Sequence, residues 1–341
     1  MDHKPTIEPE LKGANIVTLQ TIDDCKKYFG VESVERFEKS LHSSKTIQDF
    51  LPFYAEVLES KTVTISTDEV YNKSPKIIIC DSLIFDCGSI TSYVGLKIDA
   101  KETHLKQISP DKNYQIKVLG SNGIIGEDGD DGDIGSSGDP GKDKSGENAE
   151  DGGIGGEGEQ GGDGGDGDDG GDTPESSLSL GSIKLYTDNR LEIIAQGGSG
   201  GDGGQGGTGG KGGPGGPGGN ASSGSCNGYN GGKGGPGGPG GPGGPGGDGG
   251  HGSKSNHDMV INLNSKEDKD LIYTQAISGK GGKGGSSSGG AKGDGGAGGS
   301  GSACGGNAGK TGAEGDKGPK GPKGTDGQEG TTPIIKIEVI S

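Results

Sequence analysis

Glycine recurs with a three-residue period in three separate blocks of this 341-residue chain. The blocks span residues 120–172, 197–252 and 279–330, and they contain all but five of the 82 glycines. Each block loses its period once, near its middle, over residues 142–151, 220–230 and 302–308. These interruptions indicate that each block folds back once on itself, which predicts six glycine-rich rods.

A period of three matches a helix of the polyproline II type, in which a rod of this length would span roughly 70 Å. Glycine at every third position leaves one face of such a helix without side chains, and the Gly-Gly-X repeat of the second block leaves two. Backbones can approach each other across these faces and exchange N–H···O=C hydrogen bonds. We therefore expect the two rods of the second block to lie in the interior of a bundle.

Two other structures share this composition. A disordered glycine-rich linker has no reason to keep its register within each rod, or to repeat the same interrupted block three times. A collagen triple helix needs one glycine per triplet and abundant proline, whereas this chain has 16 prolines and many of them lie in Gly-Gly-X repeats. Residues 120–141 and 309–330 have the collagen pattern, so a collagen-like structure remains the alternative.

Short stretches of alternating apolar and polar residues separate the glycine blocks. Residues 182–196 read SIKLYTDNRLEIIAQ, with Asp188 and Asn189 at a turn, which is typical of a β-hairpin. Residues 259–277 repeat the pattern around a longer charged turn, and residues 334–340 form a final strand. We expect these strands to build one shared β-layer from which the rods project.

The chain before the first glycine block predicts two further domains. Residues 61–119 contain four or more short strands, which form either a sheet or a short solenoid. Residues 1–60 are expected to form a helical region, with Thr21 and Asp24 as an N-terminal cap. With residues 120–341 as the glycine-rich domain, the predicted fold class is mainly β, with a bundle of about six polyglycine/polyproline II helices projecting from a β-layer and a small α-helical N-terminal region.

The charge of the chain restricts its partners. The formal net charge is −18, and the first glycine block alone holds 17 acidic residues against Lys142 and Lys144. This excess disfavours nucleic acid and anionic membranes as partners. The acids could bind Ca²⁺, pair with the seven lysines of the third block, or keep the chain soluble by repulsion, and the last role is favoured because their spacing matches no calcium-binding loop.

The residues that usually carry chemistry do not form a recognisable site. The five cysteines lack zinc-binding spacing, the five histidines are scattered, and no phosphate-binding loop is present, so we expect no metal, no cofactor and no enzymatic activity. Cys226 and Cys304 each fall in the mid-block turn of their glycine block, which makes a disulfide between them a candidate if the rods are equal in length.

Neither membrane insertion nor a usual secretion route is indicated. No apolar run approaches the length that spans a membrane, and the first residues lack the charged-then-apolar pattern of a signal peptide. Export by another route, or release by lysis, leaves an extracellular, cell-surface or virion location as the expectation.

The doublet repeats, above all GGKGGPGGPGGPGGPGGDGG at residues 231–250, resemble two known groups of proteins. These are the polyglycine II sandwich domains of tail-fibre tip adhesins from T-even-like bacteriophages and the glycine-rich antifreeze protein of snow fleas, with collagen-like bacterial surface proteins as a second choice. The resemblance covers residues 120–330. It implies that the N-terminal region attaches to a fibre, that the glycine rods form a rigid body, and that distal loops contact a receptor.

The leading functional hypothesis is a non-enzymatic adhesion protein that presents its loops to a cell-surface glycan or protein receptor. The N-terminal helices would attach the chain to a fibre or to further copies. The candidate receptor contacts are Lys144, Asn148, Asn220, Ser223, Asn227, Tyr229, Asn230, Ser302 and Asn307. The loops could equally be plain connectors, because asparagine, serine and glycine are common in any turn. A structural collagen-like or matrix protein is the alternative function, and ice binding is the third.

Overall fold

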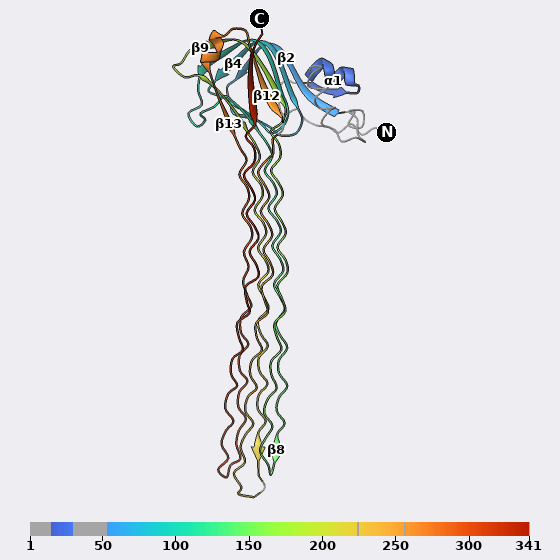
Figure 1. The fold of residues 1–341 in the computed structure, drawn as a ribbon, viewed down its shortest axis with the longest axis vertical. Helices are drawn as coiled ribbons and strands as arrows, with labels where there is room; N and C mark the ends of the chain where they lie inside the picture. Colours follow the sequence, from blue (N-terminus) through green and yellow to red (C-terminus); the bar gives the residue numbers. More distant parts are fainter. Residues whose placement is uncertain (1–14, 30–52, 224, 256, 341) are drawn as a thin grey trace.

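The computed structural model describes residues 15–29, 53–223, 225–255 and 257–340. Figure 1 shows two parts, a compact head that contains both ends of the described chain and a long, narrow stalk that extends from it. We call the segments between residues 120 and 330 that leave the head the glycine stalk. The helices expected within residues 30–52 lie outside the described residues.

One α-helix and a large sheet form the N-terminal side of the head. Helix α1 (Ile22–Phe29) lies between the first two strands in the sequence, β1 (Asn15–Leu19) and β2 (Phe53–Ile65). These two strands pair in an antiparallel way, and the other strands of the sheet pair in parallel. The seven-stranded sheet has the order β1, β2, β4 (Lys76–Asp86), β6 (Leu96–Gln107), β9 (Ser176–Leu185), β12 (Asp258–Leu263) and β14 (Ile334–Val339).

A second sheet of five parallel strands packs against the first. Its order is β13 (Ile272–Ile277), β10 (Leu191–Gln196), β7 (Ile116–Leu119), β5 (Ile90–Ser92) and β3 (Glu69–Tyr71). From β2 onward the chain within the head alternates between the two sheets, and each strand pairs in parallel with the next strand of its own sheet along the chain. This alternation is typical of a β-solenoid, and the strands of residues 61–119 are therefore divided between the two sheets.

The head is held together by apolar side chains between its two sheets. Alternate residues of β4 and β6, such as Leu83, Phe85 and Ile98, are fully buried and meet Ile116 of β7 from the opposite sheet. A smaller apolar cluster, including Leu19, Cys25 and Val57, lies where α1 packs against the first strands. Among the described residues no helix is long and apolar enough to span a membrane.

The glycine stalk leaves the head where three strands of the five-stranded sheet end, namely β7, β10 and β13. Its segments span residues 120–141, 149–171, 197–219, 231–253, 279–300 and 309–330, and they run side by side to a distant tip (Figure 1). Backbone hydrogen bonds at every third residue join them, such as Gly126 N–H to Asp202 O at 2.9 Å and Gly213 N–H to Gly156 O at 2.8 Å. The segments are therefore cross-linked by their backbones along their whole length.

The hydrogen bonds define which segments are neighbours. The two segments of the second block each bond to four others, whereas residues 120–141 and 309–330 each bond to two. The second block therefore occupies the interior, as its Gly-Gly-X repeat predicted. The first block lies along one edge of the stalk and the third along the other, so the lysines of the third block do not neighbour the acids of the first.

Glycine is required because no space exists for a side chain between the segments. A Cβ atom on Gly210 would lie 1.8 Å from the carbonyl oxygen of Asp133, and one on Gly235 would lie 1.8 Å from that of Gly153. Both neighbours are backbone atoms that cannot rotate away. The close approach of backbones, which the three-residue period suggested, is thus a property of the structure.

The predicted fold class is nevertheless wrong. The described residues form a mixed fold with a parallel-rich seven-stranded sheet, sheets of five and two strands and one α-helix, and the glycine segments belong to no helix. They appear instead as extended chain that is hydrogen-bonded only to its neighbours. The description as polyglycine/polyproline II helices projecting from a single β-layer is therefore replaced by a two-sheet head with a stalk of extended segments.

Two further expectations are corrected. Residues 182–196 and 259–277 are not hairpins, because β9 and β12 lie in one sheet while β10 and β13 lie in the other.

Of the region expected to be helical, only Ile22–Phe29 is an α-helix among the described residues, and β2 begins at Phe53. Its alternate residues Ala55 and Val57 are buried against the helix, which favours a strand. The predicted cap is confirmed, since Thr21 N–H and Asp24 N–H each bond to the other's side chain at 2.9 and 3.1 Å.

Candidate functional site at the tip of the stalk

Three turns meet at the end of the glycine stalk that lies farthest from the head (Figure 1). We call residues 142–151, 220–230 and 300–308 the first, second and third tip turns. Short strands β8 (Lys144–Ser145) and β11 (Ala221–Ser222) pair in parallel and join the first two turns. Ala221 N–H donates to Ser300 O at 2.9 Å and joins the second turn to the third. The three turns therefore form one continuous surface.

Asparagine side chains link the turns in a regular series. Asn230 N–H donates to Asn148 Oδ1 at 2.8 Å, and Asn307 N–H donates to Asn230 Oδ1 at 2.9 Å. In the same way Ser300 N–H donates to Asn220 Oδ1 at 2.8 Å. The carboxamide oxygens of Asn148, Asn220 and Asn230 therefore support the tip itself, and these three predicted contacts have a structural role in addition to any contact with a ligand.

Tyr229 and Ser302 join the second and third tip turns. Tyr229 N–H donates to Ser302 Oγ at 2.8 Å, and Ser302 N–H donates to Tyr229 O at 2.9 Å. Ser302 Oγ also donates to Asn227 O at 3.1 Å, while the Asn227 side chain donates to Tyr229 Oη at 3.4 Å. Ser302 is only 4% exposed, so it cannot present its hydroxyl to a receptor. Asn227 is exposed and Tyr229 is half-buried, which leaves both accessible.

Lys144 lies between two carboxylates of its own turn. Its Nζ is 3.2 Å from Glu150 Oε1 and 3.4 Å from Glu147 Oε1. The hydrogen bond that Lys144 donates to Glu150 and the charge of Glu147 raise the pKa of Lys144, and the same hydrogen bond lowers the pKa of Glu150. The cation is thus neutralised locally. Ser223, the remaining predicted contact of the second turn, is half-buried.

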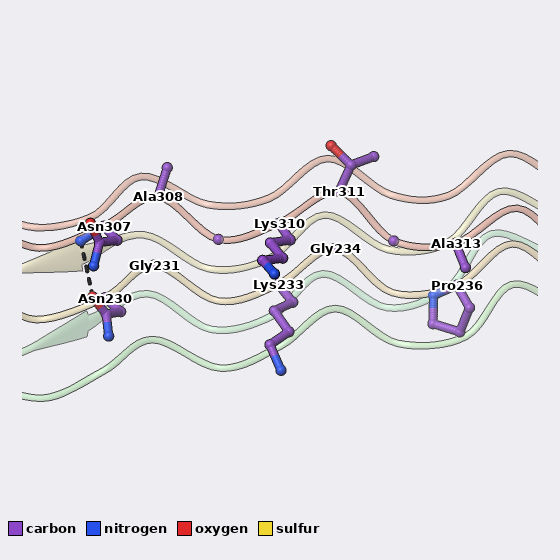
Figure 2. A pocket seen from close by; sticks show the side chains of 12 residues that line it. Asn230, Gly231, Lys233, Gly234, Pro236, Asn307, Ala308, Lys310, Thr311 and Ala313 are labelled. Carbon is purple, nitrogen blue, oxygen red and sulfur yellow. Dashed lines mark hydrogen bonds between the residues drawn. The ribbon is translucent and has the colours of Figure 1, made fainter.

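A groove beside the second and third turns was not predicted. It has a volume of about 570 Å³ and runs along the edge formed by residues 230–236 and 307–313. Figure 2 shows Lys233 and Lys310 near its middle, Asn230 hydrogen-bonded to Asn307 at one end and Pro236 near Ala313 at the other. The groove could have been found from the sequence, because Asn230 and Asn307 are 77 residues apart and so are Lys233 and Lys310. Residues at this spacing face each other across neighbouring segments.

The same spacing explains many of the acids in the stalk. Asp128 Oδ1 and Asp131 Oδ1 each accept a backbone hydrogen bond at 2.7 Å, from Gln205 N–H and Thr208 N–H respectively. Where the second block carries proline, as at Pro214 and Pro217, the residues 77 positions earlier are Ser137 and Pro140. Proline has no N–H, so no acceptor is needed there. Aspartate and proline are thus two ways to avoid an unpaired amide on the stalk surface.

The described residues show no group of three or more His, Cys, Asp or Glu side chains that could hold a metal ion. The first-block acids that accept backbone hydrogen bonds, such as Asp151 from Lys233 N–H at 2.7 Å, are already engaged in holding the segments together. A role in cross-linking adjacent backbones therefore accounts for them directly, without a cation.

The two tip cysteines lie next to each other. Cys226 of the second turn and Cys304 of the third are both exposed free thiols, and their Sγ atoms are 2.7 Å apart. The candidate pair named from the sequence is therefore brought together by the fold.

Comparisons with known proteins give little beyond this geometry. No protein-family model and no curated protein matches the chain. Among solved structures, one similarity is to the nine polyproline type II helical bundle springtail antifreeze protein from Granisotoma rainieri, at 20% sequence identity and a TM-score of 0.12, over 60% of this chain and 94% of that protein. A TM-score this low supports no conclusion about fold or function.

Proposed function

We propose that this protein is a non-enzymatic recognition protein that presents the tip turns to a cell-surface glycan or protein. The observation that carries the proposal is the position of the three turns, which form a joined polar surface at the end of a stalk, as far from the head as the molecule allows (Figure 1). An extracellular, cell-surface or virion location fits such a shape.

The stalk is suited to holding a binding surface at a distance. Its interior glycines are buried, and each pair of neighbouring segments is joined by backbone hydrogen bonds of about 2.8 Å at every third residue. Bending would have to break many of these bonds together. The tip turns would then approach a ligand with their relative positions already set, which reduces the entropy lost on binding.

The chemistry of the tip favours a polar, uncharged ligand. The uncharged accessible members of the predicted set are the half-buried Ser223 and Tyr229 and the exposed Asn148, Asn220, Asn227, Asn230 and Asn307, and tyrosine, serine and asparagine are common in adaptable binding surfaces. Lys144 is paired with Glu147 and Glu150 and therefore offers little free positive charge. Hydroxyl and amide groups of a glycan, or of a peptide backbone, match these donors and acceptors.

A binding assay with two matched triple variants tests the proposal. The tip variant changes Ser223, Asn227 and Tyr229 to alanine, and the control changes Thr208, Lys211 and Lys317, which are exposed on the stalk and do not line the groove, to alanine. Fluorescently labelled proteins are applied to a glycan array and to a panel of intact bacterial cells. We expect the tip variant to lose at least about tenfold in affinity, as removal of central contacts usually does, and the control to bind like the unchanged protein.

Unchanged binding of a folded tip variant would contradict the proposal. Circular dichroism and thermal unfolding of both variants establish that the head and stalk are intact. If the control loses binding as strongly as the tip variant, the binding surface lies along the stalk, and the tip proposal is equally wrong.

A second candidate, a self-assembling structural protein, is favoured by the edge of the large sheet. Strand β14 is the last strand of the seven-stranded sheet and leaves Ile334 54% and Val339 38% exposed, and Ile340 directly after it is 55% exposed. An exposed apolar edge strand can pair with a second copy of the chain. Light scattering over a dilution series distinguishes the candidates: assembly that is abolished by Ile334→Lys in β14 supports a filament, and a monomer at every concentration excludes it.

A further inference from the structure

Cys226 and Cys304 come from different glycine blocks and are 78 residues apart in the sequence. Their Sγ atoms nevertheless lie 2.7 Å from each other, at the tip and in contact with solvent. A disulfide has an S–S distance of about 2.05 Å and requires closely placed Cβ atoms, so only a small adjustment separates these thiols from a bond.

We propose that Cys226 and Cys304 are a site of oxidative modification and form a disulfide that locks the second tip turn to the third. The proposal concerns the covalent structure of the tip and holds whatever ligand the tip binds.

The backbones next to the pair are already fixed to each other. Tyr229 exchanges two hydrogen bonds with Ser302, one from each backbone amide, at 2.8 and 2.9 Å. A Cβ on Gly228 would lie 2.8 Å from the carbonyl oxygen of Gly305, so the residues after Cys226 and after Cys304 also touch. Gly305 has φ +93°, which lets the third turn reverse directly after Cys304. The sulfurs therefore meet because of the fold around them.

The other cysteines differ from this pair. Cys25 and Cys80 are buried, and burial is the main cause that raises the pKa of each thiol, that of Cys80 to about 11. Cys87 is partly exposed, and its Sγ donates to Gln107 Oε1 at 3.1 Å. The tip pair combines exposure with a neighbouring thiol, which is what selective oxidation requires.

The oxidation can be balanced with a small-molecule disulfide such as oxidised glutathione. The Cys226 thiol loses its proton, and the thiolate attacks one sulfur of glutathione disulfide, forming a mixed disulfide and releasing one glutathione thiolate. The Cys304 thiol then loses its proton, and its thiolate attacks the Cys226 sulfur of the mixed disulfide and releases the second glutathione thiolate. The protein loses two protons and two electrons, and glutathione disulfide gains them as it is reduced to two thiols.

Peptide mapping tests the proposal directly. The full chain is equilibrated with reduced and oxidised glutathione, alkylated and digested with trypsin without reduction. We expect peptide Gly212–Lys233, which contains Cys226, to be linked to Gly293–Lys310, which contains Cys304, and the linkage to disappear after reduction. Each peptide contains one cysteine, so the linkage identifies the pair.

A position-shifted variant controls for simple proximity of exposed thiols. Ser225→Cys combined with Cys226→Ser moves one thiol by a single residue while keeping the number of cysteines. At the same glutathione ratio, we expect the ratio of oxidised to reduced tip pair to be at least about tenfold lower in this variant. The reason is that a disulfide forms only within a narrow range of Cα and Cβ separations. Equal oxidation of both proteins would overturn the proposal, since the geometry would then have no effect.

Other outcomes also overturn it. Glutathione attached to Cys226 and Cys304 separately would show that the two sulfurs do not react with each other, and linkage between two copies of the chain would show that the partner thiol is on another molecule. Full alkylation of both cysteines in the oxidising buffer would show that no disulfide forms.

Discussion

In the head, apolar side chains of two parallel sheets fill the interior, whereas in the glycine stalk the backbones of neighbouring segments fill it. The head contains the conventional core residues, such as Phe85 and Tyr71, and its cohesion comes largely from burial of apolar surface. The stalk has no side chains to bury between its segments and depends on hydrogen bonds at every third residue. The two parts of one chain therefore respond to different substitutions.

The contrast also concerns tolerance. A core residue of the head can often be exchanged for another apolar residue of similar volume at modest cost. An interior glycine of the stalk has no such substitute, because even a methyl group would meet a carbonyl oxygen of the neighbouring segment.

The largest effect is expected inside the head, at a buried ion pair. Lys76 Nζ lies 2.7 Å from Glu56 Oε1, and both side chains are at most 1% exposed. Lys76→Met would leave the buried carboxylate without its cation and is expected to lower the free energy of unfolding by about 3–5 kcal/mol. Urea unfolding followed by circular dichroism measures the change.

The matched control lies on the same sheet at its surface. Lys101 pairs with Asp81 at 2.6 Å, but the two side chains are 80% and 53% exposed. Lys101→Met is expected to change the free energy of unfolding far less than Lys76→Met does, because solvent screens an exposed pair. Similar losses for both variants would show that burial does not set the strength of the Lys76 pair.

The next largest effect is expected in the interior of the stalk. Gly210→Ala places a Cβ 1.8 Å from the carbonyl oxygen of Asp133, so the segments must separate locally and lose hydrogen bonds. We expect a loss of about 1–3 kcal/mol, together with faster amide exchange of the neighbouring glycines. Hydrogen exchange measured by mass spectrometry locates the change.

Thr208→Ala is the control, because Thr208 is exposed on the same segment, two residues away. Its amide exchange should match that of the unchanged protein. If Gly210→Ala is as harmless as Thr208→Ala, the segments do not pack as closely as the structure shows, and the distinction between head and stalk fails.

A smaller effect is expected where an aspartate on the stalk surface accepts a backbone hydrogen bond from the neighbouring segment. Asp131→Ala removes the acceptor of Thr208 N–H and is expected to destabilise by about 0.5–1.5 kcal/mol. Asp130→Ala removes the same charge, but the Asp130 side chain makes no hydrogen bond to the described residues. Thermal unfolding of the two variants should therefore differ, and identical melting would contradict the structural role of these acids.

The smallest effect concerns an acid on the head. Hydrogen bonds from Lys184 and His104 lower the pKa of Glu102 to about 2 from its ordinary 4.5. Because the pKa is lower in the folded state, the stabilisation is complete above about pH 4.5 and is lost as the pH falls towards 2. The stability difference between the unchanged protein and Glu102→Gln should shrink over this range.

Lys184→Gln sharpens this test, because it removes the principal hydrogen-bond donor and keeps the carboxylate. We expect the pKa of Glu102 to rise in this variant, as measured by NMR titration. A midpoint that stays near 2 would assign the shift to other groups.

Local signals in the sequence were reliable where local chemistry decides the structure. The cap at Thr21 and Asp24 formed as predicted, since both partners lie within one helical turn. Residues 334–340 gave a strand at the expected place. The interior position of the second glycine block also followed from its repeat, because two bare faces allow neighbours on both sides.

The hairpin at Asp188 and Asn189 shows where local reasoning ended. The chain does turn there, but β9 and β10 enter different sheets. Each strand pairs in parallel with a strand far away in the sequence, so Ile183 of β9 lies opposite Thr103 of β6. A strand with one buried face shows the same alternation of apolar and polar residues whether its neighbours are parallel or antiparallel. The sequence pattern therefore could not distinguish the two pairings.

The sequence by itself determined where side chains had to be absent, and hence which segments could lie against each other. Only folding decided that the strands wind through two sheets, that the glycine segments are extended chain, and that Lys233 lies beside Lys310 in the groove next to the tip turns. The physical reason is that a missing Cβ is a property of one residue, whereas pairing and register depend on how distant segments align.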